Sequence, residues 1–188
     1  LERDGRTVTL KIPSMAALLE GETPCCTRRI EVQCEPESEF HYSDAGFCLI
    51  QQLIEDVTNN PYDKMVDELI FTPLGMTNSH LHIPAEEMDN KEFSCGHDQK
   101  GDYIDGKYPI YPYPASSGLW TTSDDLALLV IELMNALKGE SAIGISACSA
   151  KEMITAQLGK SWTGLGLFLE GSGEKLEITS LGWGKGFQ

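Results

Sequence analysis

The chain reads Phe40-His41-Tyr42-Ser43-Asp44-Ala45-Gly46-Phe47 at the point where its most regular part begins. From there, apolar side chains recur at helical spacing along one face of residues 45–59, which is typical of an amphipathic helix. That face carries Phe47, Ile50, Leu53, Ile54 and Val57. The sequence therefore predicts a helix over residues 45–59 that buries this face in the core.

A second helix is predicted directly after the first. Asn60 suits the capping position, and Pro61 suits the first helical position, where its missing N–H removes no hydrogen bond. The predicted buried stripe consists of Tyr62, Met65, Val66, Leu69 and Ile70. We expect this helix to run to about Phe71 and to end at Pro73-Leu74-Gly75.

Two further helices are predicted in the second half of the chain. Thr122 and Asp125 form a capping-box pair, and Gly139 is typical of the residue that ends a helix. The predicted buried side chains between them are Leu126, Leu129, Val130, Leu133 and Leu137. Ser149 with Glu152 predicts the start of a fourth, short helix that runs to about residue 157.

The last part of the chain changes from helical to strand character. Residues 162–170 and 175–181 are predicted as strands, joined by a hairpin turn at Gly171-Ser172-Gly173-Glu174. Because helices come first and an antiparallel hairpin follows, the sequence predicts an α+β fold.

The same patterns divide the chain into three parts. Residues 1–40 are predicted to be an irregular lead-in with a short helix at 13–19. Residues 41–158 are predicted to form a mainly helical domain with a long loop at 77–118, where glycines and prolines interrupt any period. Residues 159–188 are predicted to be the start of an antiparallel sheet.

Composition excludes some classes of function. Of the 188 residues, 41% are hydrophobic, which is enough for a core. The net charge of −15 repels nucleic acid and anionic membranes, so we expect neither as a partner. No apolar run approaches the length needed to span a bilayer.

The six cysteines show no C-x-x-C spacing. Adjacent Cys25 and Cys26 would make a poor zinc motif and a strained disulfide. We interpret the cysteines as mostly reduced thiols, which favours a cytoplasmic protein. His80 and His82 alternate at strand spacing but lack an evident third ligand, so we expect neither a metal site nor a cofactor.

Residues 40–84 resemble the family of serine β-lactamases and penicillin-binding proteins, including its esterase branch. The resemblance rests on the Tyr-Ser-Asp start of the first helix and on Pro73-Leu74-Gly75-Met76-Thr77-Asn78-Ser79. It is extended by Gly118-Leu119-Trp120-Thr121-Thr122-Ser123-Asp124-Asp125-Leu126 and by the glycine-rich strand pair of residues 164–187. It implies the helical region of the β-lactamase/transpeptidase-like fold together with the beginning of its antiparallel sheet.

Members of this family use three catalytic elements: S-x-x-K on a helix, Tyr/Ser-x-Asn, and K-T-G or H-x-G on an edge strand. The serine hydroxyl is a weak nucleophile and needs a base within hydrogen-bond reach. The sequence holds one S-x-x-K, Ser172-Gly173-Glu174-Lys175, in the predicted hairpin turn, where the two side chains would not share a helix face. We therefore expect the true element before Leu1, and we expect the 188-residue chain alone to be inactive.

The resemblance implies that Tyr42 is the catalytic residue of the second element. It would move a proton between the serine and the leaving group, which requires nearby positive charge to stabilise its anion. An aromatic residue that packs on the core at a helix start is the structural alternative. Asp44 replaces the usual Asn in the substrate-binding position and can accept but not donate a hydrogen bond, which disfavours penicillin-like substrates. A plain helix N-cap is the alternative for Asp44.

The third element corresponds to Ser180-Leu181-Gly182, where Ser180 and Gly182 would contact the substrate. Gly182 would permit close approach to the strand. Ser180 replaces a Lys or His, so the site lacks a cation for a substrate carboxylate. An ordinary strand serine is the alternative. Ser116-Ser117-Gly118 does not form the G-x-S-x-G elbow of another hydrolase fold.

Two hypotheses follow for the function. In the first, the chain is part of a serine hydrolase that forms an acyl-enzyme with a small-molecule ester or amide. In the second, the chain is a binding protein that kept the fold and lost the site, which Asp44 and Ser180 both favour. Because sheet edges would remain unpaired, we also expect self-association or association with another segment.

Overall fold

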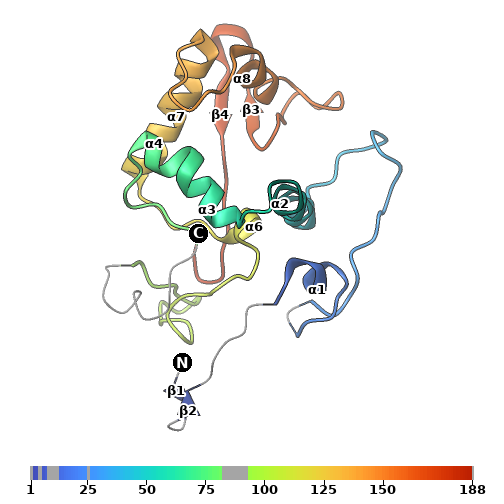
Figure 1. Ribbon diagram of the computed structural model, residues 1–188, viewed down its shortest axis with the longest axis vertical. Helices are drawn as coiled ribbons and strands as arrows, with labels where there is room; N and C mark the ends of the chain where they lie inside the picture. Colours follow the sequence, from blue (N-terminus) through green and yellow to red (C-terminus); the bar gives the residue numbers. More distant parts are fainter. Residues whose placement is uncertain (1, 4–5, 8–12, 25, 82–92, 188) are drawn as a thin grey trace.

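The computed structural model describes residues 2–3, 6–7, 13–24, 26–81 and 93–187. The α-helices are α1 (Met15–Leu19), α2 (Asp44–Thr58), α3 (Tyr62–Val66), α4 (Thr72–Leu74), α6 (Pro114–Ser117), α7 (Ser123–Lys138) and α8 (Ala147–Met153). A π-helical turn, η1 (Asp67–Phe71), joins α3 to α4 (Figure 1). The strands are β1 (Glu2–Arg3), β2 (Arg6–Thr7), β3 (Phe168–Glu170) and β4 (Glu177–Thr179).

Helix α2 starts one residue earlier than predicted, and its cap is Ser43. The Ser43 hydroxyl accepts a hydrogen bond from the Gly46 N–H at 3.2 Å, which satisfies a backbone donor that the helix itself leaves free. Asn59 ends the helix in the left-handed conformation, with φ of 54°. Interpreting Asp44 as the N-cap is therefore wrong, and its carboxylate is available for other contacts.

The predicted buried face of α2 is mostly exposed. Ile50, Leu53 and Val57 are 52%, 62% and 76% exposed, whereas Cys48 and Gln51 are buried. The reason is that α1 and α6 both pack on the side of α2 that carries Cys48 and Gln51. The core cluster on that side consists of Met15, Leu18 and Cys48, with Leu19, Cys26 and Tyr113 packed against it.

The second predicted helix is present, but it is not a uniform α-helix. Pro61 is the N-cap rather than the first helical residue, and the helix passes through η1 before Gly75 ends α4 with φ of 70°. Within the predicted stripe, Leu69 is 58% exposed, and the buried side chain of this region is Phe71.

The ends of α7 agree with the sequence prediction. The Thr122 hydroxyl accepts from the Asp125 N–H at 3.3 Å, and Gly139 closes the helix with φ of 82°. The buried face of α7 differs from the predicted one. Asp125, Glu132 and Ala136 are buried, whereas Leu126 and Val130, which were predicted to be buried, are exposed. Helix α8 is capped by Ser146, not by Ser149, whose N–H donates to the Ser146 hydroxyl at 3.0 Å.

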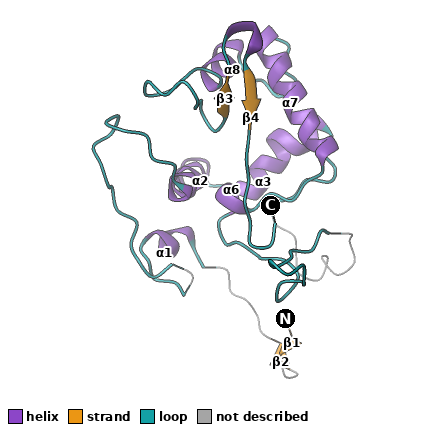
Figure 2. Cartoon of the chain, turned by 180° about the vertical axis from the view of Figure 1, so that it is seen from behind, coloured by secondary structure: helices purple, strands orange, loops and turns teal. Residues whose placement is uncertain are grey.

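The predicted hairpin near the end of the chain is confirmed, with shorter strands. β3 and β4 are antiparallel, with Leu169 opposite Ile178. The hairpin lies at the same end of the molecule as α7 and α8, and a second small pair joins β1 to β2 (Figures 1 and 2). Many helices with a small antiparallel hairpin confirm the α+β class. Within the described ranges, no helix is both long and apolar enough to cross a membrane.

Candidate active site

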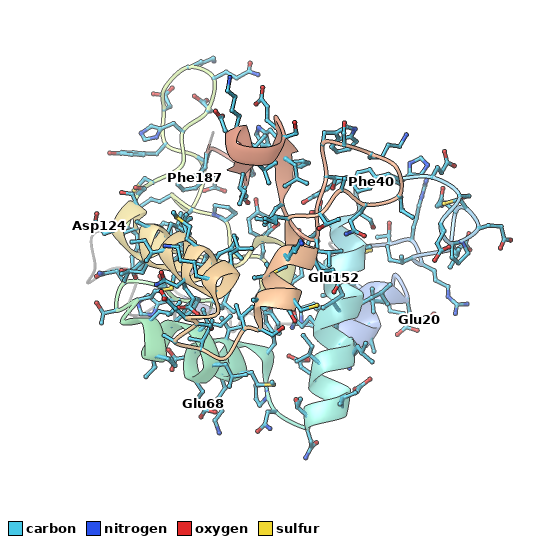
Figure 3. The ribbon with its side chains drawn as sticks, turned by 90° about the horizontal axis from the view of Figure 1, so that it is seen from above. Glu20, Phe40, Glu68, Asp124, Glu152 and Phe187 are labelled. Atoms are coloured by element: carbon cyan, nitrogen blue, oxygen red, sulfur yellow. The ribbon has the colours of Figure 1, made fainter. Side chains whose placement is uncertain are left out.

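Tyr42 lies on the surface, two residues before α2. Its side chain is 61% exposed, and its hydroxyl donates a hydrogen bond to Asp44 Oδ1 at 3.2 Å. The segment before it is anchored by Phe40, whose ring centroid lies 4.9 Å from that of Trp162 in an edge-to-face contact (Phe40 is labelled in Figure 3). Because Tyr42 is mostly exposed, its interpretation as a core aromatic is wrong.

Asp44 also binds a residue from a distant part of the sequence. Ser116 on α6 donates from its hydroxyl to the same Asp44 Oδ1 at 3.0 Å. Helix α6 is held against α2 by Gln51, whose side-chain oxygen accepts from the Ala115 N–H at 3.2 Å. Two hydroxyls, from Tyr42 and Ser116, thus meet at one carboxylate oxygen. We refer to Tyr42, Asp44 and Ser116 as the Asp44 cluster.

The environment of Tyr42 raises the pKa of its phenol above the ordinary value. Partial desolvation of the phenol is the largest cause, although most of the side chain is exposed, followed by the negative charge of Asp44 and by the hydrogen bond to it. Tyr42 therefore keeps its proton at neutral pH in the Asp44 cluster. A cation near the phenol would be needed to make it a base.

Ser180 and Gly182 lie outside regular structure. β4 ends at Thr179, so neither residue is on a strand, and the prediction of a strand to residue 181 is wrong at this end. In the described part of the chain, no hydrogen bond joins Ser180 or Gly182 to the Asp44 cluster. Apart from its chain neighbours, no described residue has an atom within 4 Å of a Cβ added at Gly182, so the described residues leave space beside this backbone. Further on, the segment is fixed by the Lys185 N–H, which donates to the Tyr111 hydroxyl at 3.0 Å.

The one S-x-x-K sequence lies at the hairpin turn. Ser172 precedes a single 3-10 turn, Gly173–Lys175, and is itself extended, with φ of −163°. This turn is at the end of the hairpin away from α2 and α6 (Figure 1). Ser172 is therefore no nucleophile for the Asp44 cluster.

A buried carboxylate joins the two most specific sequence blocks, residues 73–79 and 118–126. Asp125, 3% exposed, accepts from the Asn78 N–H at 2.8 Å and from the Ser79 hydroxyl at 2.7 Å. Beside it, His80 and Trp120 exchange two backbone hydrogen bonds of 2.8 Å. Burial raises the pKa of Asp125, but hydrogen bonds from Ser79, Asn78 and Thr122 outweigh it, so the pKa lies below its ordinary value.

A pocket of about 430 Å³ lies close to the cluster but does not contain it. Its walls include Gln51 and Pro114, whereas neither Tyr42 nor Asp44 contributes to them. Within the cluster, Tyr42 and Asp44 are exposed and Ser116 is half-buried. The second histidine of the His80–His82 pair lies outside the described residues, so that pair is not placed.

Solved structures share the fold of this chain. The penicillin-binding protein homologue of Pyrococcus abyssi matches with a TM-score of 0.63 and 22% identity, over 86% of this chain and 36% of that one. The D-amino acid amidase of Ochrobactrum anthropi SV3 matches with a TM-score of 0.60 and 24% identity, over 82% of this chain and 48% of that one. The fold is therefore that of penicillin-binding proteins and D-amino acid amidases.

The family model for Beta-lactamase matches residues 27–187, which is most of the chain. The chain belongs to the beta-lactamase family. This confirms the resemblance inferred from the motifs. A curated relative, the "Putative D-alanyl-D-alanine carboxypeptidase" of Escherichia coli K12, is 24% identical over 172 residues. The match covers 74% of this chain and 38% of that protein, so the chain spans less than half the length of this relative.

Proposed function

We propose that this chain is part of a serine hydrolase that works through an acyl-enzyme. The observation that carries the proposal is the Asp44 cluster, which presents the hydroxyl of the motif tyrosine, Tyr42, on the surface beside the start of α2. Tyr42 would transfer the proton between the attacking serine and the leaving group, as a general acid and base. The Asp44 carboxylate would orient that phenol.

The serine and the lysine would come from a segment outside these 188 residues. Support comes from the hairpin turn that follows Ser172, which lies at the end of the hairpin away from α2 and α6 (Figure 1). It also comes from the match to the curated relative, of which the chain spans 38%. A lysine beside Tyr42 would oppose the charge of Asp44 and lower the pKa of the phenol into a useful range.

The substrate would be a small ester or amide without an acidic group next to Asp44. An ionised Asp44 repels a substrate carboxylate, and a neutral Ser180 offers no cation to bind one. The name of one similar protein, a D-amino acid amidase, favours amides of D-amino acids. Neutral D-amino acid amides and esters are therefore the substrates to test first.

The whole protein is expected to become acylated, whereas residues 1–188 alone are not. Intact-mass spectrometry after incubation with a chromogenic ester should show one acyl group on the whole protein, and peptide mapping should place it on a serine of a helical S-x-x-K. Turnover by the purified 188-residue chain, lost in Tyr42→Phe, would contradict this. So would an acyl group on Ser172.

The alternative is a binding protein without catalysis. It is favoured by the two departures from the family motifs, Asp44 in place of Asn and Ser180 in place of Lys or His. Under this hypothesis the whole protein binds a D-amino acid amide in calorimetry but shows neither acylation nor turnover.

Self-association of the chain is the third part of the proposal. The exposed apolar face of α2 includes Ile50, Leu53 and Val57, and such faces mark association surfaces. The Pyrococcus abyssi relative is described as octameric.

In light scattering, the 188-residue chain is expected to exceed the monomer mass, and Leu53→Glu is expected to reduce that mass. Val32→Glu is a matched control, because Val32 is 90% exposed on a loop and outside this face. A monomeric wild-type chain, or equal masses for the two variants, would contradict the proposal.

A further inference from the structure

The long connection between α1 and α2 contains a tight reversal of the chain. The connection spans residues 20–43 and extends away from the helices (Figure 1). Within it, Ser38 donates to the Glu35 carbonyl from its N–H at 3.2 Å and from its hydroxyl at 2.7 Å. Glu37 takes the left-handed conformation with φ of 65°, which non-glycine residues adopt rarely. The turn brings the chain after it back toward Cys34.

Three potential metal ligands meet beside this turn. The Cys34 sulfur, a Glu39 carboxylate oxygen and a His41 ring nitrogen all lie within 4.8 Å of one another. Glu39 Oε1 and His41 Nε2 are 3.1 Å apart. Glu39 and His41 are two residues apart in the segment that follows the turn. Cys34 carries a free thiol, so its sulfur is not used in a disulfide.

We infer that Cys34, Glu39 and His41 form a site for a zinc-like divalent ion, with water as the fourth ligand. Thiolate, imidazole and carboxylate are the three ligand types that zinc prefers, and this set does not suit magnesium or calcium. A tetrahedral zinc site with usual bond lengths separates neighbouring ligand atoms by about 3.4–3.6 Å. The observed spacing reaches that geometry with side-chain movements of about an ångström, which the exposed side chains of Glu39 and His41 can make.

The metal site would also restrict the conformation of the loop that leads into α2. His41 directly precedes Tyr42, so an ion held by His41 and by Cys34 would tie the loop down on both sides of the turn. The inference does not rest on the proposed hydrolase function, because it concerns binding of the ion alone.

Titration with Co²⁺ tests the inference directly. The purified protein is expected to develop the near-ultraviolet charge-transfer absorption of a cobalt–thiolate bond, and Zn²⁺ is expected to displace it. Cys34→Ser should abolish this absorption. His41→Gln and Glu39→Gln should each weaken Zn²⁺ binding at least tenfold in calorimetry.

Cys148→Ser is the matched control, because Cys148 is also a free thiol but lies on α8, where it is exposed, whereas Cys34 is half-buried. It should bind both ions as the wild type does. The inference is overturned if Cys34→Ser keeps the absorption, or if the wild type shows none. X-ray absorption of the zinc-loaded protein gives a second readout: one sulfur and three nitrogen or oxygen neighbours support the site, and any other count contradicts it.

Discussion

Replacing Tyr42 by Phe is expected to lower kcat of the whole protein by about 10²–10⁴-fold, with little change in KM. The substitution removes the hydroxyl that donates to Asp44 Oδ1 and keeps the ring. On the proposed function, that hydroxyl moves a proton in the transition state only, so its loss affects the chemical step. Steady-state kinetics with a neutral chromogenic ester measures both constants.

Tyr103→Phe is the matched control, because Tyr103 is 67% exposed and its ring contacts His97, outside the Asp44 cluster. It should keep wild-type kinetics.

Asp44→Asn keeps an acceptor for the phenol but removes the charge that raises the pKa of Tyr42, so the Tyr42-dependent limb of the pH–rate profile should move to lower pH. An unchanged kcat in Tyr42→Phe would show that Tyr42 does not transfer a proton in the reaction.

Asp125→Asn is expected to cause the largest loss of stability. The Asn78 N–H and the Ser79 hydroxyl both donate to one oxygen, Oδ2, so the amide oxygen of Asn can still accept from both, but a neutral acceptor makes weaker hydrogen bonds than a carboxylate. It also removes a negative charge from the first turn of α7. We expect the midpoint of thermal unfolding at pH 7 to fall by about 4 °C or more.

The pH dependence of this loss has a defined sign. The folded pKa of Asp125 is lower than that of the unfolded chain, so the ionised carboxylate stabilises the fold above about pH 4. This contribution disappears as the pH falls through the lowered folded-state pKa of Asp125. The unfolding midpoints of the wild type and of Asp125→Asn should therefore converge at that pH. Asp124→Asn is the matched control, because Asp124 lies on the same turn and is exposed (Figure 3). Equal midpoints for the two variants would contradict the prediction.

Local signals in the sequence predicted local structure well. The ends of α7 follow from Thr122 and Gly139, because a cap depends on residues within one turn. The hairpin follows in the same way from its glycine-rich turn. Where two serines compete, as at the start of α8, the spacing of Ser149 and Glu152 was the weaker guide and Ser146 makes the cap.

Contacts between distant segments could not be predicted. The apolar stripe of α2 shows that the helix has an apolar face, but α1 and α6 pack on the side that carries Cys48 and Gln51. Ser116 was missed because its partner is 72 residues away and no motif links the two. The preceding Pro114, which suits a first helical position, is the one local signal for α6.

The hydrogen bonds around Asp125 affect which changes in chain length this protein can tolerate during evolution. They close the base of the segment between residues 80 and 120, because His80 pairs with Trp120 where the segment begins and ends. Lengthening a closed segment adds only a slowly growing entropy cost, about 0.6 kcal/mol for each doubling. Insertions and deletions at exposed turns of this segment, such as Lys100-Gly101, can therefore accumulate while α4 and α7 keep their places, whereas the part that forms α6 is held against α2.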